Sequence, residues 1–356
     1  MALPQERMLV VDEEEDVLKE LTPIGPLPSR TAILVAAARA FGSREPDESV
    51  RNPDSLANLL IGQSELALIS DHPIYAGLTQ DYAEGSHDLA TVLFVATMLW
   101  RTRFIDEALM RAVKNGATQV VFLGAGFDTR AYRFRELLKD CKVIEVDAAP
   151  TQKYKRRRVE EVLGEVPTNV IYCTVDFAED KLIESLRQSG FCEGEKTFYV
   201  WEGVCMYLPE DSVRKTLRRI ASHSDPASSV VLDYANTLGI EYIKLAPNSP
   251  GAIPPSWGEP WIFGVPGTNG IEFFRELGFD PGVPLSTMSP EIIKRYGTRP
   301  DGTVYAAQAF EKMRTQAQTQ SQSPPSALID LRNAIAAAGG AYWLNELTVS
   351  GLSGKS

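Results

Sequence analysis

The apolar positions along the chain change their spacing near residue 119. Before that point, the segments TAILVAAARAF, SLANLLI and LATVLFVATMLW carry apolar residues at helical spacing, and no run predicts a strand. We therefore expect residues 29–118 to form a helical cap. The preceding residues, 1–28, are acidic and then rich in proline, and they predict a mobile arm.

After residue 119, short apolar runs alternate with helical segments. The runs that predict strands are VVFLG (120–124), KVIEVD (142–147), NVIYCTVD (169–176), TFYVWEG (197–203) and SSVVLDY (228–234). Strands that alternate with helices form parallel sheets with right-handed crossovers. The predicted fold class is therefore α/β with a doubly wound, mostly parallel sheet, and we assign residues 119–235 to its core.

The remaining segments predict additions to that core within a single domain that spans residues 29–356. Residues 236–311 begin with a Pro- and Gly-rich stretch and predict an irregular insertion on the substrate side. Residues 312–325 include the polar run TQAQTQSQSPP and predict a surface loop. Residues 326–356 predict a helix and then a strand at the edge of the sheet.

A glycine turn follows the first predicted strand, where an open α/β sheet binds its ligands. Gly124, Ala125 and Gly126 form this turn, and a residue without a Cβ lets the backbone approach a ligand closely. Asp147 ends the second strand, 23 residues after Gly124. This is near the spacing of about 20 residues expected for an acid that binds ribose hydroxyls.

The next two strands also end in acidic residues. Asp176 could accept a hydrogen bond from the exocyclic amine of adenine while Phe177 covers the ring, and Glu202 ends the fourth strand. Taken singly, the two aspartates could cap the helices that follow them, and the glycines could serve only a tight turn. Their joint occurrence at successive strand ends favours a nucleoside site.

The glycine turn departs from the common phosphate-binding patterns. Thr129 replaces the third glycine of a dinucleotide fingerprint, and no Walker lysine follows. Asp128 at the mouth of the turn would repel a pyrophosphate, whereas it would tolerate a sulfonium and an ammonium group. The pattern therefore favours S-adenosylmethionine over a nicotinamide dinucleotide.

The composition argues against several classes of binding partner. A net charge of −11 argues against nucleic acid, and the basic run 153–158 lies in a helical pattern that predicts a solvated helix face. No apolar stretch is long enough to span a bilayer, and the acidic N-terminus is unlike a secretory signal. We therefore expect a cytoplasmic protein that is a monomer or a homodimer. We also expect no bound metal, because the four cysteines form no CxxC pair and only three histidines occur.

The motif VVFLGAGFDTRAYRF, followed by IEVD and by VWEGVCMYLPEDSV, resembles the leucine carboxyl methyltransferase family. This resemblance covers roughly residues 29–235. It implies a class I S-adenosylmethionine-dependent methyltransferase with a seven-stranded Rossmann-like sheet, an N-terminal helical cap and a variable insertion after strand five.

The same resemblance implies roles for several residues. Gly124 would line the methionine part of the cofactor, Asp147 would bind the ribose, Asp176 with Phe177 would frame the adenine, and Glu202 would lie beside the cofactor. Arg101 or Arg103 would pair with the cofactor's carboxylate. We favour Arg101 because of its position on the predicted helix relative to Phe104. Thr31 and Arg39 are further candidates.

The expected function is the methylation of an oxygen, either a carboxylate or a hydroxyl, on a small molecule of specialised metabolism. Two alternatives stay open, a methyltransferase of protein C-termini and a cofactor-binding protein that does not methylate. Tyr207 could orient the acceptor or serve only packing. Trp257 and Trp261 could wall the acceptor pocket or pin the insertion.

Overall fold

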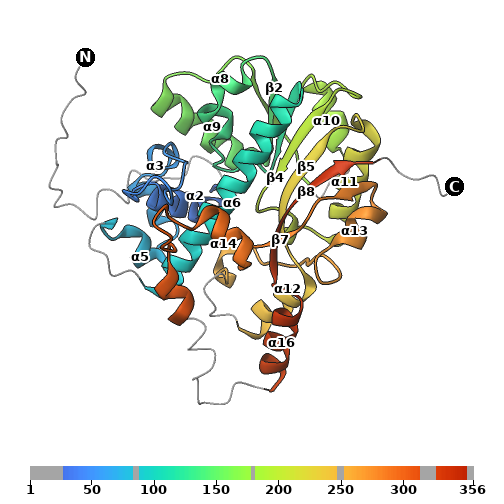
Figure 1. Ribbon diagram of the computed structural model, residues 1–356. Helices are drawn as coiled ribbons and strands as arrows, with labels where there is room; N and C mark the ends of the chain where they lie inside the picture. Colours follow the sequence, from blue (N-terminus) through green and yellow to red (C-terminus); the bar gives the residue numbers. More distant parts are fainter. Residues whose placement is uncertain (1–26, 83–87, 178–180, 247–251, 313–325, 351–356) are drawn as a thin grey trace.

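A computed structural model describes residues 27–82, 88–177, 181–246, 252–312 and 326–350. The predicted arm lies almost entirely outside the described residues, as do most of the predicted loop 312–325 and the last residues of the chain. The described part has a central sheet with helices on both of its faces (Figure 1).

Within the described residues, the sheet has eight strands in the order β3-β2-β1-β4-β5-β8-β6, and β7 also pairs with β8. The first five are parallel neighbours, as the alternating pattern predicts, and β8 runs antiparallel to β5. The strands are β1 (Gln119–Leu123), β2 (Lys142–Asp147), β3 (Val170–Thr174), β4 (Thr197–Trp201), β5 (Ser229–Ala235), β6 (Phe279–Pro281), β7 (Leu285–Ser286) and β8 (Tyr342–Val349).

Two expectations about the sheet need correction. It has eight strands instead of seven, because the two-residue β7 adds a short pairing. The C-terminal strand β8 is not at the edge, since it lies between β5 and β6. Its side chains agree with this position: Leu344 and Leu347 are fully buried, one on each face of the sheet.

The helices before β1 are α2 (Arg30–Gly42), α3 (Ala57–Leu60), α4 (Gln63–Ala67), α5 (Tyr75–Thr79) and α6 (Leu89–Lys114). They confirm the helical character predicted for the first third of the chain. Ser29 and Asp88 cap α2 and α6 by accepting hydrogen bonds from the amides of Ala32 and Thr91, respectively. The long α6 does more than cap the cofactor end, because it packs along the sheet beside β4, β5 and β8.

The helices after β1 are α7 (Arg130–Arg133), α8 (Arg135–Leu138), α9 (Ala149–Leu163), α10 (Leu182–Gln188), η2 (Cys205–Tyr207), α11 (Glu210–His223), α12 (Thr237–Leu245), η3 (Pro255–Trp257), α13 (Ile271–Glu276), α14 (Pro290–Tyr296) and α16 (Ser326–Ala337). Helices α10, α11 and α13 share one face of the sheet, opposite α6 and α9 (Figure 1). Alternate strand residues feed the two cores: Val120 and Phe122 join one, and Val121 and Leu123 join the other.

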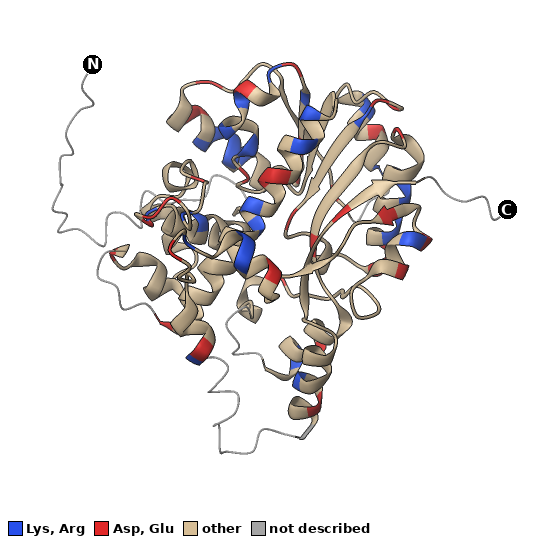
Figure 2. Ribbon diagram, in the orientation of Figure 1, with Lys and Arg blue, Asp and Glu red and all other residues tan. Residues whose placement is uncertain are grey.

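Charged residues gather on the outer helices and are sparse along the strands (Figure 2). The basic run on α9 is only partly the solvated face that its pattern predicts. Lys155 is buried and its ammonium lies 2.9 Å from the buried carboxylate of Glu145 on β2, whereas Arg156 and Arg157 are exposed. One basic residue of the run therefore ties α9 to the sheet.

Candidate functional site

A large cavity of about 900 Å³ opens at the carboxyl ends of β1 to β5. It lies at the point where the strand order reverses between β1 and β4, the usual ligand site of such sheets. Of the residues proposed from the sequence, those that line this cavity are Thr31, Arg39, Arg101, Gly124, Ala125, Gly126, Asp147, Asp176, Phe177, Glu202, Tyr207 and Trp261.

The glycine turn after β1 has a backbone that only glycine adopts readily. Gly124 and Gly126 have φ angles of +69° and +44°. A Cβ on Gly124 would stand 2.3 Å from the Cγ2 of Val204, which follows β4. Glycine is therefore required at residue 124 both by its backbone conformation and by the close approach of Val204.

Asp147, at the end of β2, is directed into this turn. Its carboxylate accepts hydrogen bonds from the amide of Gly126 at 2.5 Å and from the amide of Ala148 at 2.7 Å. Burial raises the pKa of Asp147 above its usual value, and the two amide donors oppose that shift. Two donors occupy part of the carboxylate, so acceptor positions remain for a ligand that offers hydroxyl hydrogens.

Arg101 on α6 and Glu202 after β4 form a buried ion pair in the cavity wall. The Nε of Arg101 lies 2.9 Å from Glu202, and its Nη1 lies 2.8 Å from Asp233 on β5. Burial alone would raise the pKa of Glu202, but the guanidinium groups of Arg101 and Arg130 hold it well below the usual range. Glu202 is therefore an anion at neutral pH, and its ion pair holds the guanidinium of Arg101 in position.

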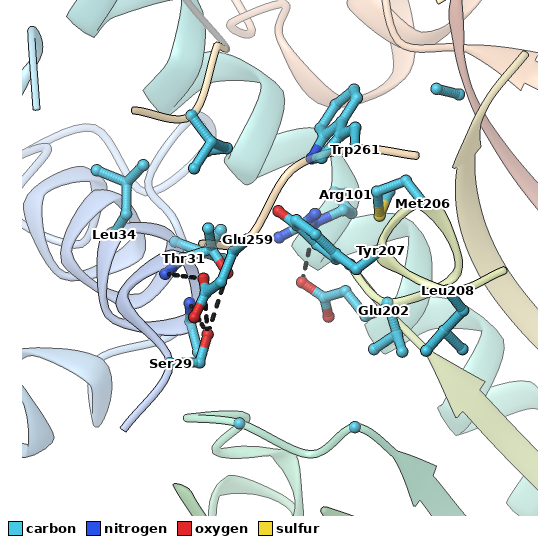
Figure 3. A pocket seen from close by; sticks show the side chains of 18 of the residues that line it. Ser29, Thr31, Leu34, Arg101, Glu202, Met206, Tyr207, Leu208, Glu259 and Trp261 are labelled. Atoms are coloured by element: carbon cyan, nitrogen blue, oxygen red, sulfur yellow. Dashed lines mark hydrogen bonds and ion pairs between the residues drawn. The ribbon is translucent and has the colours of Figure 1, made fainter. Parts of the chain in front are cut away.

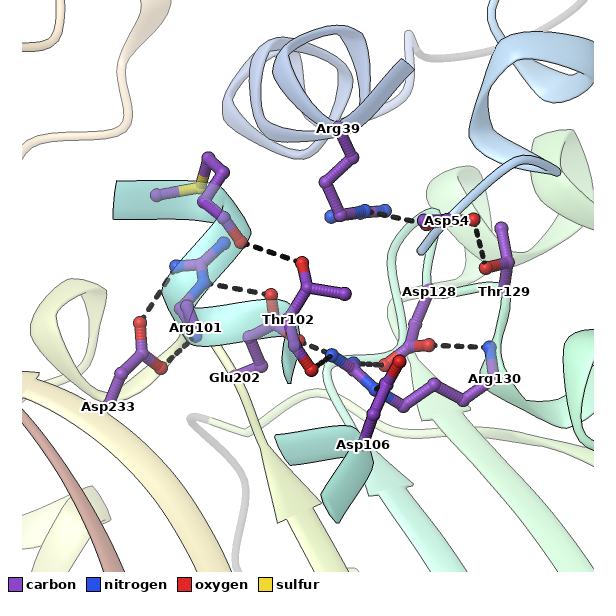
Figure 4. A network of polar contacts seen from close by, with 12 residues as sticks. Arg39, Asp54, Arg101, Thr102, Asp106, Asp128, Thr129, Arg130, Glu202 and Asp233 are labelled. Carbon is purple, nitrogen blue, oxygen red and sulfur yellow. Dashed lines mark hydrogen bonds and ion pairs between the residues drawn. The ribbon is translucent and has the colours of Figure 1, made fainter. Parts of the chain in front are cut away.

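A larger network of alternating charges lies behind the cavity (Figure 4). Arg130 is its centre, with Asp106, Asp128 and Glu202 each 2.6 Å from its guanidinium. The sequence did not predict this role of Arg130. Its only signal in the sequence was its place in the DTRAYR motif, next to Asp128. The burial of Thr129 and Ala131, which makes a charge between them need partners, is visible only in the structure.

This network changes the interpretation of Asp128. The carboxylate was expected to repel a pyrophosphate at the mouth of the turn. It lines the cavity, but it accepts hydrogen bonds from both the amide and the guanidinium of Arg130. Arg130 partly neutralises its charge, so Asp128 gives a weaker argument against a dinucleotide than its position in the sequence suggests.

The two candidate arginines of α6 differ in their surroundings. Arg103 is directed away from the cavity, and its guanidinium donates hydrogen bonds to the carbonyls of Glu48, Ser49 and Arg51. Because these bonds hold the side chain against the loop after α2, we do not include Arg103 among the residues that would bind the cofactor. Arg39 lines the cavity while its guanidinium binds Asp54 and the Phe127 carbonyl.

The two tryptophans of the insertion also differ. Trp257 does not line the cavity, because its indole N–H donates to Asp71 at 2.9 Å and its ring packs on His72. Trp261 does line it, stacked on Tyr342 with ring centroids 5.8 Å apart. Trp257 therefore pins the insertion, and Trp261 forms part of the cavity wall.

The half of the cavity away from the glycine turn is mainly apolar. Its side chains come from α2, α6, α12 and the insertion, and they include Leu34, Leu93, Phe94, Met98, Ile243, Ile253, Ile262 and Met288. Among the described residues that line the cavity there is no histidine, and no cluster of described residues could hold a metal ion. No helix in the described part of the chain could cross a membrane.

The residues present fit an S-adenosyl group with a free amino acid end. The glycine turn presents its backbone to the cavity, and Asp147 offers acceptors beside it. The Nη2 of Arg101 is buried and has no hydrogen-bond partner among the described residues. A carboxylate on the ligand would satisfy this donor.

Comparison with known proteins agrees with this geometry. A model of the leucine carboxyl methyltransferase family matches residues 32–221. YktD of Bacillus subtilis, named as an S-adenosyl-L-methionine-dependent methyltransferase, is 30% identical over 218 residues, which cover 58% of this chain and 71% of YktD. A protein of Streptomyces avermitilis named for the same activity is 30% identical over 264 residues, covering 72% of this chain and 89% of that relative.

The family match spans more than half of the chain and includes the glycine turn, Asp147, Glu202 and the network around Arg130. On this ground, the chain belongs to the leucine carboxyl methyltransferase family and is a methyltransferase that depends on S-adenosylmethionine.

Proposed function

We propose that this enzyme methylates an oxygen atom, of a carboxylate or a hydroxyl, on a small and largely apolar molecule. The observation that carries this proposal is the cavity that joins the glycine turn to an apolar half. Its volume of about 900 Å³ is near the upper end of the range of about 300–1,000 Å³ for small-molecule sites. It can therefore receive a cofactor and an acceptor together.

The cofactor half supports the following assignments. Gly124, Ala125 and Gly126 would face the methionine part, and Asp147 would accept the two ribose hydroxyls. Asp176 and Phe177 line the same cavity beyond β3 and would frame the adenine. Arg101 would bind the carboxylate, with Glu202 as the residue that holds its guanidinium in place.

When bound, S-adenosylmethionine supplies a methyl group on a sulfonium, and the sulfur leaves as a neutral thioether after an in-line displacement. The chain's task is to align the acceptor oxygen and to exclude water. A carboxylate acceptor is already ionised and needs no base. For a hydroxyl acceptor, Tyr207, which lines the cavity, would orient the oxygen as a hydrogen-bond donor. Burial raises the pKa of its phenol to about 12, so the donor proton is retained.

The apolar wall of the cavity argues against the alternative acceptor, the C-terminus of a protein. The side chains of Leu93, Phe94 and Ile243 would contact an acceptor without offering a charge or a strong donor. A peptide backbone would leave its amides and carbonyls unpaired against such a wall. This chemistry supports a small apolar molecule, and we propose that it is a compound of specialised metabolism.

The direct test is to incubate the enzyme with methyl-labelled S-adenosylmethionine and a panel of apolar carboxylic acids, phenols and C-terminal peptides. We expect label on an acid or a phenol and none on the peptides. Ester products are cleaved by mild alkali and aryl ethers are not, so alkali treatment separates the two acceptor types. Label on the peptides alone would overturn the small-molecule proposal.

A further inference from the structure

Three buried donor atoms in the cavity wall lack a hydrogen-bond partner in the described part of the chain: the Nε and Nη2 of Arg101 and the indole Nε1 of Trp261. The Nε of Arg101 forms an ion pair with Glu202 at 2.9 Å, which leaves the Nη2 and the indole N–H to be explained. Buried donors of native proteins are almost always paired, so each such atom needs an explanation. Both residues line the same cavity, which suggests that one ligand group serves both.

The surrounding contacts fix both donors in place. Arg101 is 3% exposed and is held through its other nitrogens by Glu202, Asp233 and the hydroxyl of Tyr342. Trp261 is stacked on the ring of Tyr342 at 5.8 Å, with the two planes 19° apart. Tyr342 thus touches both residues, one through its hydroxyl and the other through its ring.

Figure 3 shows the indole nitrogen of Trp261 pointing toward Arg101 and Tyr207. The ring of Tyr207 meets that of Trp261 edge to face, with centroids 6.4 Å apart. The indole N–H is close enough to the phenol of Tyr207 to oppose the rise in its pKa, but it makes no hydrogen bond of normal geometry there. The two donors therefore converge from different elements, α6 and the insertion, on one part of the cavity.

The segment that carries Trp261 is tied down on both sides of this residue. The carboxylate of Glu259 accepts a hydrogen bond from the amide of Thr31 at 3.0 Å, at the start of α2. The amide of Ile262 donates to the carbonyl of Met206 at 2.8 Å. Trp261 is thus held in position without the help of its own N–H, which is left for a ligand.

A carboxylate is the group that suits such a pair of donors. Arg101 supplies a charge and a directed N–H, while the indole is a donor that cannot accept. We propose that Trp261 is a second donor to the carboxylate of the cofactor's methionine part, beside Arg101. Trp261 lies outside the residues matched by the family model, so this contact is a contribution of the insertion to cofactor binding.

The test compares two ligands that differ at this group, S-adenosylhomocysteine and methylthioadenosine, which lacks the amino acid end. Their dissociation constants are measured by calorimetry on the wild type and on Trp261→Phe. The substitution keeps an aromatic ring and removes the N–H. We expect the affinity for S-adenosylhomocysteine to fall about tenfold or more, as for a hydrogen bond to a charged group, and that for methylthioadenosine to stay within about twofold.

Trp257→Phe is the matched control, since it removes an indole N–H from the same segment but outside the cavity. We expect it to leave the ratio of the two affinities unchanged. An unchanged ratio in Trp261→Phe would overturn the proposal, and so would an equal loss for both ligands, which would assign Trp261 to the shape of the cavity. No acceptor is needed, so the outcome is independent of the proposed O-methylation.

Discussion

The guanidinium of Arg130 and the carboxylate of Glu202 lie 2.6 Å apart, and both side chains are at most 10% exposed. Arg130 comes from the turn after β1, and Glu202 follows β4. Glu202 in turn holds Arg101 of α6 at 2.9 Å. One chain of ion pairs therefore links the glycine turn, the β4 loop and the long helix that together border the cofactor half of the cavity.

Replacing Arg130 with Met should destabilise the protein by about 3–5 kcal/mol, because Asp106, Asp128 and Glu202 would lose a shared buried cation. Urea unfolding followed by circular dichroism measures this change. Arg135→Met is the control, since Arg135 is exposed and its contact with Glu136 is long, at 3.7 Å; we expect a change below about 0.5 kcal/mol there. A similarly small effect in Arg130→Met would contradict the central role of this network.

The ionisation of Glu202 should contribute to the way in which the free energy of unfolding depends on pH below neutrality. Although burial alone raises its pKa, Arg101 and Arg130 together bring the folded-state pKa below that of an unfolded glutamate, which is about 4.3. The stability that its ionisation contributes is thus complete above about pH 5 and is lost as the pH falls toward the folded pKa.

We therefore expect Glu202→Gln to be less stable than the wild type at pH 7, with the difference narrowing below about pH 5. Urea unfolding of both proteins over a range of pH values measures it. Curves that stay parallel down to the acid transition would mean that the pKa of Glu202 is not lowered by folding.

Gly124 has no room for a larger residue. In Gly124→Ala the new Cβ would meet Val204 at 2.3 Å, in addition to the cost of a positive φ. We expect a loss of more than about 2 kcal/mol in stability together with weakened S-adenosylhomocysteine binding.

Gly164→Ala separates these two effects. Gly164 ends α9 with a φ of +80°, and a Cβ added to it would meet no described atom within 4 Å. Only the backbone cost of about 1–2 kcal/mol therefore applies. Cofactor affinity in this control should equal that of the wild type. Equal stability losses in both variants would remove the argument for a close approach at Gly124.

The sequence was sufficient to predict the parallel strands and the cavity residues at their ends. Buried parallel strands are short apolar runs, and in such a sheet the residue after each run lies at the ligand edge. Gly124, Asp147 and Glu202 each follow such a run, so their convergence required no knowledge of the helices. The choice of Arg101 over Arg103 rested on helical register, and the cavity-lining position of Arg101 agrees with it.

The parts that depended on distant contacts could not be predicted. The position of β8 inside the sheet is decided by the short β6, which is only three residues long and has no clear strand pattern. Trp257 and Trp261 are four residues apart in one Pro-rich segment, and only the partner Asp71 and the stacked Tyr342 distinguish them. The pairing of Asp128 with Arg130 likewise depends on how the turn folds.

Asp147 provides the most direct test of the cofactor half. If its carboxylate accepts the ribose hydroxyls, Asp147→Ala should reduce the affinity for S-adenosylhomocysteine by about a hundredfold or more, since two hydrogen bonds to a charged group are lost. Calorimetric titration measures this, and circular dichroism checks that the variant is folded.

Asp147→Asn tests the same residue by its charge. The amide oxygen can still accept the hydrogen bond from Gly126, so the turn should be retained, while affinity falls to an intermediate value. Because burial raises the pKa of Asp147, wild-type affinity should begin to fall at a higher pH than an exposed aspartate would allow. Ligand binding follows the ionised form, so affinity is lost as the pH decreases through this pKa, and the Asn variant should lack that dependence. Wild-type affinity in Asp147→Ala would show that the ribose binds elsewhere.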